Sequence, residues 1–485
     1  MHQTPVTPLR TYRPFVDNRW CEPSREAWIE ILDPATESVV ARAARAGPSD
    51  VEAAVAAAER AGPAWSALQP ARRGAVLHAW AARIASDVDT LAWLETEEVG
   101  KRISKSRGEV SSVVEMLRFY AGAADKVHGQ TIPLGPDAVD FTLLEPVGVT
   151  AHVVPWNAPM AMAVRSLAPA LTVGCTAVVK PAEEASGAVF RIAELAAEAG
   201  LPAGVLNVVP GLGEEAGAAL VSHPRVSTVT FTGSVETGRE VMQQAAANVT
   251  PVILELGGKS AMVVFADANV EKAAEDATRG ILTNNGQVCI AAARVIVHDD
   301  IYEEFIQHLA TRFGRTEIGP GAADAPLGPL VSQQQRLRVL DHVSTARAEG
   351  ARAITGRGTP TGPGVGYYVI PTILADVTTA MRCSQEEIFG PIVCALRFDD
   401  EPAAIRMAND VRYGLAAAVY TSDVGRALRV ARGIEAGTVW VNTWGAGGAQ
   451  VPVGGYKQSG IGREKGMVAL SNYLQTKNVI VHHGC

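Results

Sequence analysis

The sequence predicts an α/β protein with two series of alternating strands and helices. Short β-branched runs alternate with helical stretches from Val147 to about residue 256, and the alternation resumes from about 260 to 440. Such alternation is typical of parallel sheets joined by right-handed helical crossovers. Two strand-like stretches, 141–145 and 478–481, lie outside both series. We therefore expect two α/β domains and a small separate β element. The unpaired strand edges of this element would pair with a partner subunit.

The part of the chain before the first series is expected to contain short strands and then helices. Strands are predicted at 29–32 and 39–43, each next to a proline-containing turn. Between residues 74 and 98, apolar residues recur at three- and four-residue steps. This spacing predicts one amphipathic helix with its apolar face on a core.

The two alternating series place functional residues at the ends of their strands. In the first series we expect strands at 147–154, 177–180, 206–209, 228–231 and 252–256, with helices near 160–173, 186–199, 214–222 and 236–247. In the second we expect strands at 294–297, 369–374, 392–398, 416–421 and 439–442. Ligands of such open sheets bind beyond the carboxyl ends of the strands, so chemistry is expected just after each strand.

Composition and charge exclude several classes of function. The net charge of −8, with scattered basic residues, gives no basic surface for nucleic acid, and no stretch has the length of a membrane span. The first residues lack the apolar core of a secretory signal. Six cysteines without regular spacing argue against a disulfide framework and against a metal site, and they favour a cytoplasmic protein. A small-molecule enzyme fits best.

Cys289 is the candidate nucleophile. It ends the run NGQVC at 285–289 and follows ELGGK at 255–259. A thiolate attacks carbonyl carbon, but an ordinary cysteine has a pKa of about 8.5, so the site must activate it. Most free cysteines are small buried apolar groups. That interpretation is kept for Cys21, Cys175, Cys383, Cys394 and Cys485.

Several runs in a fixed order carry a family resemblance. They are PWNAP at 155–159, KPAE at 180–183, FTGSVETG at 231–238, ELGGK at 255–259, GQVC at 286–289, EEIFGP at 386–391 and GGYKQSGIGRE at 454–464. Together they resemble the NAD(P)-dependent aldehyde dehydrogenase superfamily over nearly the whole chain. The resemblance implies a Rossmann-like NAD-binding domain at 1–124 and 146–255, a catalytic α/β domain at 256–444, and oligomerisation strands at 125–145 and 466–485. It also implies a homodimer or homotetramer.

The resemblance assigns catalytic roles that also make physical sense. Asn157 and the backbone N–H of Cys289 would stabilise the oxyanion, and losing one such donor typically costs about 2.7–4 kcal/mol of barrier. Glu255, at a strand end, would activate the hydrolytic water. Taken alone, these residues could be a turn asparagine and a solvated glutamate. The glutamate favours hydrolysis to the acid over transfer to coenzyme A.

The expected cofactor is NAD, and no metal is required. Gly233, Ser234 and Gly238 lie at a strand-to-helix turn, where helix N-terminal donors meet pyrophosphate, although such spacing alone is also that of an ordinary tight turn. The fingerprint GxGxxG is absent. Lys180 and Glu183 would bind the adenosine ribose, and a carboxylate there repels a 2′-phosphate. Alternatively, Lys180 and Glu183 could form an ion pair on the surface.

The other cofactor residues and the substrate residues are implied by position. Glu387 and Phe389 match contacts to the nicotinamide ribose and ring, and Trp156 would line the adenine side or the oxyanion site unless it is a core aromatic. Arg165 would hold a phenolate or carboxylate, or else form a structural ion pair. Family members often place phenylalanines at Ala158, Gly447 and Val453, which predicts a wider tunnel here. Further lining candidates, with a core position as alternative, are Met160, Met162, Trp440 and Trp444.

The expected reaction is NAD-dependent oxidation of an aldehyde, aromatic or anionic, to the carboxylic acid through a cysteine thiohemiacetal and thioester. Two alternatives remain open at this point. One is a thiolate esterase or acyl transferase without redox chemistry. The other is a non-catalytic NAD-binding scaffold.

Overall fold

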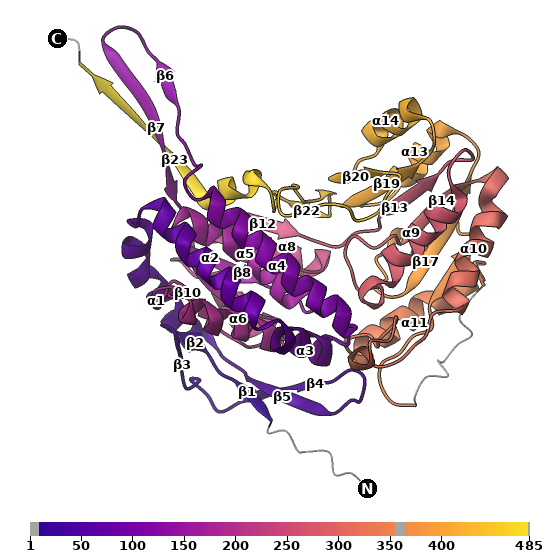
Figure 1. Cartoon of the computed structure of the whole chain (residues 1–485), viewed down its shortest axis with the longest axis horizontal. Helices are drawn as coiled ribbons and strands as arrows, with labels where there is room; N and C mark the ends of the chain where they lie inside the picture. Colours follow the sequence, from indigo (N-terminus) through magenta and orange to yellow (C-terminus); the bar gives the residue numbers. More distant parts are fainter. Residues whose placement is uncertain (1–8, 355–363, 484–485) are drawn as a thin grey trace.

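The computed structural model describes residues 9–354 and 364–483, so Cys485 lies outside the described residues. Two large sheets, each flanked by helices, occupy the two ends of the molecule, and a long β arm projects from the first (Figure 1). The α/β class with a separate β element is therefore confirmed. No described helix is both long and apolar enough to cross a membrane.

The first sheet has eight strands in the order β22-β12-β11-β8-β9-β10-β2-β3. Its five central strands are parallel and match the predicted series: β8 (Val149–Val153), β9 (Thr176–Lys180), β10 (Leu206–Val208), β11 (Thr228–Thr232) and β12 (Val252–Glu255). Short antiparallel strands complete the edges: β2 (Phe15–Val16), β3 (Arg19–Trp20) and β22 (Gly460–Ile461). The β22 strand brings Gly460 opposite Glu255.

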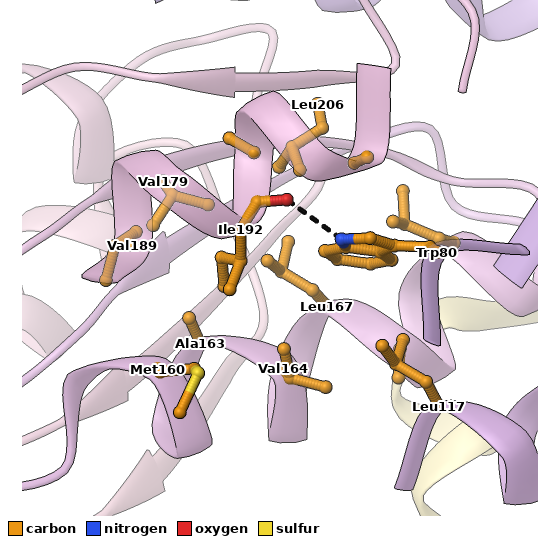
Figure 2. Packing of buried hydrophobic residues seen from close by; sticks show 14 of the residues in the cluster. Trp80, Leu117, Met160, Ala163, Val164, Leu167, Val179, Val189, Ile192 and Leu206 are labelled. Atoms are coloured by element: carbon orange, nitrogen blue, oxygen red, sulfur yellow. Dashed lines mark hydrogen bonds between the residues drawn. The ribbon is translucent and has the colours of Figure 1, made fainter. Parts of the chain in front are cut away.

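Helices bury both faces of this sheet. One face is covered by α2 (Pro70–Ser86), α3 (Val88–Val99), α4 (Ile103–Ala123), α5 (Pro159–Val173) and α6 (Gly187–Glu198). The other is covered by α1 (Pro48–Ser66), a π-helical turn (Gly213–Gly217), α7 (Ala218–Val221) and α8 (Val235–Ala246). In the first layer, the buried Trp80 donates its indole N–H to the Ile192 carbonyl at 2.8 Å (Figure 2). The indole is thereby satisfied inside an apolar core.

The single helix expected at 74–98 is wrong, because the chain forms two helices that meet at Asp87. The backbone of Asp87 leaves the helical region at φ −109° and ψ 23°. Its carboxylate accepts from Arg191 Nε of α6 at 2.7 Å. Aspartate is a residue type that favours helix starts, so the sequence held a sign of the break that the apolar spacing concealed.

The second sheet has seven strands in the order β15-β16-β17-β14-β13-β19-β20. The predicted strands are present as β14 (Arg294–His298), β16 (Thr372–Ala375), β17 (Ile392–Phe398), β19 (Ala416–Tyr420) and β20 (Thr438–Val441), with β15 (Arg352–Ala353) added antiparallel. The sequence prediction missed β13 (Ala261–Val264), a fully buried strand between β14 and β19. Its four residues are too few to show a periodicity. The helices are α9 (Val270–Leu282), α10 (Tyr302–Gly314), α11 (Gln333–Ala348), α12 (Arg382–Gln385), α13 (Glu401–Asn409) and α14 (Val424–Gly433).

The two strand-like stretches outside the series pair with each other. They are the cores of β7 (Ala138–Pro146) and β23 (Leu474–His482), which run antiparallel and are joined by β6 (Thr131–Pro133) into the projecting arm (Figure 1). Near the N-terminus, the expected strands β4 (Trp28–Leu32) and β5 (Val39–Ala44) form a separate sheet with β1 (Arg10–Tyr12). A two-stranded ribbon joins β18 (Tyr413–Gly414) and β21 (Tyr456–Lys457).

Candidate active site

The carboxyl ends of three neighbouring strands of the first sheet form the floor of the site. Phe231 in β11 pairs with Val153 in β8, and Thr232 pairs with Glu255 in β12, so these strands end together. The segments that follow them carry Trp156, Asn157, Gly233 and Ser234. This is the edge at which the sequence predicted chemistry.

One cavity of 170 Å³ brings together the three predicted catalytic residues. Asn157, Glu255 and Cys289 all line it, although they lie on separate parts of the chain. Of the other predicted site residues, Trp156, Met162, Gly233, Ser234, Glu387 and Phe389 also line it. A nucleophile, a carboxyl group and an amide donor therefore share one space.

A strained segment leads to Cys289. Asn284 and Asn285 both have left-handed backbones, with φ of 49° and 60°. Gly286 has φ +77°, and a Cβ there would lie 2.1 Å from the backbone of Gly390. Asn285 Nδ2 donates to the Pro329 carbonyl at 2.8 Å. Backbone strain of this kind persists only where neighbouring residues stabilise the conformation, so Cys289 lies on a rigid segment.

Asn157 is tied to the same segment. Its Nδ2 donates to the Gln287 carbonyl at 2.9 Å, which leaves its second N–H. Asn284 Nδ2 in turn donates to the Asn157 carbonyl at 2.8 Å. These two bonds fix the amide relative to the cysteine, as an oxyanion donor requires.

Burial keeps the nucleophile and the carboxyl group uncharged. Burial raises the pKa of Cys289 to about 12 and that of Glu255 to about 8. The positive charge of Arg165 opposes both pKa shifts, whereas the Glu464 carboxylate raises the pKa of Glu255 further. At neutral pH, both groups are therefore mostly protonated in the protein alone.

Arg165 is buried and forms an ion pair with Glu464, while its Nη2 lies 4.0 Å from Glu255 Oε2. Of the two roles expected for Arg165, the ion pair is the one the structure contains. The sequence prediction gave Glu464 no role, although it ends the run GGYKQSGIGRE. Its backbone pairs with that of Val453 through two hydrogen bonds of 2.8 Å.

A larger cleft of 490 Å³ continues from the catalytic cavity. The two share Pro155, Trp156, Thr232, Gly233 and Ser234 in their walls. At the far part of the cleft, Lys180 Nζ lies 2.7 Å from Glu183 Oε2. Apart from Gly238, the predicted cofactor residues thus line one continuous space that leads to Cys289.

Two predicted glycines play different parts in this cleft. Gly233 lines both spaces, and its neighbour Ser234 caps α8 by accepting from the Thr237 N–H at 3.1 Å. Gly238 does not belong to the wall of either. A Cβ at Gly238 would lie 2.6 Å from the side chain of Leu256, so this glycine permits close packing of α8 on the segment after β12.

The wall facing Cys289 is built by Glu387 and Phe389. Glu387 Oε1 accepts from the Gly258 N–H at 3.0 Å, and burial raises the pKa of this carboxyl to about 7. A Cβ at Gly257 would lie 2.2 Å from the Glu387 carboxylate, so a side chain there would displace this carboxylate. The Phe389 ring meets Trp156 edge-on at 5.4 Å.

No sequence motif predicts two further wall residues, Gln335 and Arg338. Gln335 Nε2 donates to the carbonyls of Ile388 and Phe389 at 3.1 and 2.8 Å, where Phe389 has a left-handed φ of 58°. Arg338 donates to the Glu387 carbonyl at 3.1 Å. Both come from α11, and together they hold the wall in place.

The remaining substrate candidates lie elsewhere. Trp444 is buried and packs against Trp440 at 5.3 Å, in the core beside α9. Neither Trp444 nor Val453 belongs to the walls of the two spaces described above. Among the described residues, no group of three or more His, Cys, Asp or Glu side chains is arranged to hold a metal ion.

Comparison with known proteins gives one consistent result. The model of the aldehyde dehydrogenase family matches residues 20–479. An aldehyde dehydrogenase of Emericella nidulans is 41% identical over 468 residues, 96% of this chain and 94% of that protein. A hydroxyisobutyraldehyde dehydrogenase of Mycolicibacterium austroafricanum is 41% identical over 467 residues, covering 96% and 92%.

A solved structure is similar throughout. The betaine aldehyde dehydrogenase of Staphylococcus aureus, in complex with NAD+, has a TM-score of 0.95 at 38% identity and covers 98% of this chain and 95% of its own. The matches in sequence and in fold thus extend over the same site. This chain belongs to the aldehyde dehydrogenase family.

Proposed function

We propose that this enzyme oxidises an aldehyde to the carboxylic acid with NAD, through a covalent intermediate on Cys289. The observation that carries this function is the shared cavity, in which Cys289, Glu255 and Asn157 face one another beside Glu387 and Phe389. The similar enzyme of Staphylococcus aureus was crystallised with NAD+. A redox-free esterase would not need the long cleft that continues from this cavity.

The cleft fits a dinucleotide by its shape and its donors. Gly233 has no side chain at the strand-to-helix turn, where a Cβ would press against the Phe231 ring at 2.4 Å. The N-terminus of α8 beside it favours an anionic pyrophosphate. Lys180 and Glu183 offer a donor and an acceptor to ribose hydroxyls. NAD supplies the acceptor of the hydride.

Glu183 also supports a preference for NAD over NADP. Its carboxylate lines the cleft, and Glu184, Glu214 and Glu240 line the same space. A 2′-phosphate would bring additional negative charge into this acidic wall. We therefore place Glu183 against the adenosine ribose and expect the phosphorylated cofactor to bind more weakly.

In the first step, Cys289 Sγ bonds to the aldehyde carbon and the carbonyl oxygen becomes anionic. Asn157 Nδ2 and the Cys289 N–H donate to this oxygen, and the thiol proton passes to Glu255 in the fraction of the enzyme in which this group is ionised. Loss of a hydride from the same carbon leaves a thioester. The pKa of about 12 at Cys289 means that this proton must leave as the bond forms.

In the second step, Glu255 returns its proton to solvent and then takes one from water. The hydroxide attacks the thioester carbon, the C–S bond breaks, and the carboxylic acid leaves. Only the carboxylate form of Glu255 can act as this base, and Arg165 at 4.0 Å favours that form. With a pKa of about 8 at Glu255, this step accelerates as pH rises through that value.

Substrate class, assembly and location remain proposals. An aromatic or anionic aldehyde is supported by the small Ala158 and Gly447 at positions where relatives often carry phenylalanine. Assembly into a homodimer or homotetramer is supported by the projecting arm, which exposes apolar side chains on β6, β7 and β23. These are Ile132, Val139, Leu143, Ile480 and Val481, and Leu134 is exposed in the turn between β6 and β7. The five described cysteines are unpaired, which supports the cytoplasm.

The experiment that tests this function replaces the nucleophile. Cys289→Ser should abolish NADH formation with every aldehyde while NAD still binds, because a hydroxyl is far less nucleophilic than a thiolate. NADH absorbance measures the first property and calorimetry the second. Near-normal turnover would contradict covalent catalysis at Cys289. Aldehyde-independent ester hydrolysis in the wild type, with no NADH formed, would favour the esterase, and no turnover of any kind would favour the scaffold.

A further inference from the structure

A separate cavity of 510 Å³ lies where the start of α4 meets α9 and α10. Its wall carries four basic side chains, Arg102, Lys105, Arg279 and Arg312, and one acidic side chain, Glu275. None of its lining residues belongs to the catalytic cavity or to the cofactor cleft. It is thus a second space with its own chemistry.

Two of the arginines are oriented by acidic residues that lie outside the cavity wall. Arg102 is paired with Asp324 at 2.9 Å and Arg279 with Asp276 at 2.7 Å, but neither acidic residue is part of the cavity wall. Arg279 uses Nη2 to bond Asp276 and the Trp444 carbonyl, so its other N–H groups remain available. The side chains are oriented, and they keep donors for a ligand.

Lys105 contributes a charge with no described acidic side chain within ion-pair distance, although it lowers the pKa of Glu109 four residues along α4. Among residues 9–354 and 364–483, no side chain forms an ion pair with its ammonium group, which is exposed on the first turns of α4. The only acidic group in the wall is that of Glu275, which lies 4.0 Å from Lys272. Arg312 also pairs with an acidic residue outside the wall, Glu271 at 3.6 Å, so the excess of basic over acidic side chains holds for the wall itself.

The cavity borders the catalytic segment. Thr283, Asn284 and Asn285 form part of its wall. Asn284 Nδ2 donates on the other side to the carbonyls of Asn157 and Gln287, at 2.8 and 3.2 Å. A single side chain therefore joins this space to the oxyanion donor, and the segment runs on to Cys289.

We propose that this cavity binds the carboxylate or phosphate group of a small molecule. Guanidinium forks and an ammonium group match the oxygens of such anions, and the volume is that of a site for a small molecule. The anion is either the distal group of the substrate aldehyde or a separate compound. Anion binding is measured without turnover, so this site stands or fails separately from the proposed function.

Direct binding tests the site. Inorganic phosphate and succinate are titrated calorimetrically into the full-length enzyme with saturating NAD, which occupies the other anion-binding cleft. Lys105→Met should weaken binding about fivefold and Glu275→Gln should strengthen it by about the same factor, the effect of one charge at about 4 Å in water. Both substitutions are at exposed positions, so folding is preserved.

The matched control is Arg107→Met. Arg107 lies on the same helix, is exposed, pairs with Asp89 and is not part of the cavity wall, so its loss should leave anion binding unchanged. Absence of saturable binding of both anions by the wild type would overturn the proposal. Binding that ignores both Lys105→Met and Glu275→Gln would also overturn it, because the anion would then be held elsewhere.

Kinetics separate the two sources of the anion. If it is the substrate's own group, Lys105→Met lowers kcat/KM for succinic semialdehyde about fivefold and leaves that for butanal unchanged. If it is a separate compound, phosphate changes the turnover of butanal by the wild type and loses that effect in Lys105→Met. Oxidation of butanal persists in every case, so failure of this site is distinct from failure of the redox function.

Discussion

Two buried ionic clusters touch helix α5, and they differ in how well their charges are matched. At the first turn, Lys101 Nζ lies 2.8 Å from Glu95 and 2.7 Å from Glu109, and Glu95 accepts from the Met160 N–H at 3.0 Å. The three ionisable groups of this cluster all have partners at hydrogen-bonding distance, although burial raises the pKa of Glu95 to about 7. A cluster built in this way stabilises the packing of α3, α4 and α5.

The second cluster is less well hydrogen-bonded, and Glu255 is its most distant member. Arg165 pairs with Glu464, but Glu255 lies 4.0 Å away, and its Oε1 accepts no hydrogen bond from any described residue. Its pKa is therefore raised to about 8 by burial. The same residue types thus stabilise the fold where their side chains have hydrogen-bond partners, and serve proton transfer where a carboxyl group lacks them.

The largest expected effect is that of Glu255→Gln. Release of the acyl group should slow about 10²- to 10⁴-fold, and more than its formation, because the amide cannot take a proton from water, whereas solvent can still take the thiol proton. Stopped-flow absorbance should show a burst of NADH followed by stalling, and the melting temperature should not fall, since no matched ion pair is lost. A uniform loss of rate without a burst would argue against a role in deacylation.

Lys101→Met should break the other cluster and act on stability. Two buried carboxyl groups lose their counter-ion, which typically costs about 3–5 kcal/mol. Denaturant unfolding measures the change, and Lys105→Met, an exposed lysine near the start of the same helix, is the control. If unfolding is unchanged while turnover falls, the contrast between the two clusters is mistaken.

Arg165→Met should slow all aldehydes alike. Without this charge the pKa of Glu255 rises further, and one pKa unit reduces the carboxylate fraction at neutral pH about tenfold. Values of kcat/KM for benzaldehyde and its hydroxylated analogues measure the effect. A loss confined to phenolic or anionic aldehydes would instead assign Arg165 to substrate binding.

Glu464→Gln should have the smallest effect and the opposite sign. The Glu464 carboxylate raises the pKa of Glu255, so its removal lets Arg165 stabilise the Glu255 carboxylate better. Deacylation requires that carboxylate, and its rate rises with pH through the pKa. The midpoint of the pH–rate profile should therefore move below about 8. An upward movement would contradict the arrangement of charges.

The two sides of the site also differ in how far the sequence predicted them. Asn157, Gly233 and Glu255 follow strands whose alternation is visible in the sequence, so their convergence at one sheet edge follows from parallel topology. The pairing of Arg165 with Glu464 depends on how the C-terminal segment returns through β22 to β12. Local patterns carry no record of such a long-range contact.

Other differences have equally physical causes. Gly238 belongs to a recognisable run, but the run does not say whether its missing Cβ makes room for a ligand or, as here, for Leu256. The sequence allows Trp444 either a place in the tunnel wall or a place in the core, and the side chain lies in the core. Gln335 and Arg338 act through carbonyls of a distant segment, which only the folded chain reveals.

The most direct test of covalent catalysis uses the Glu255→Gln variant after its burst. The enzyme is mixed with an aldehyde and NAD, quenched in acid and digested. The mass of the peptide that contains Cys289 is then measured by mass spectrometry. The predicted result is a mass increase equal to the acyl group on Cys289, in proportion to the NADH formed. Formation of NADH with an unmodified Cys289 peptide would contradict it.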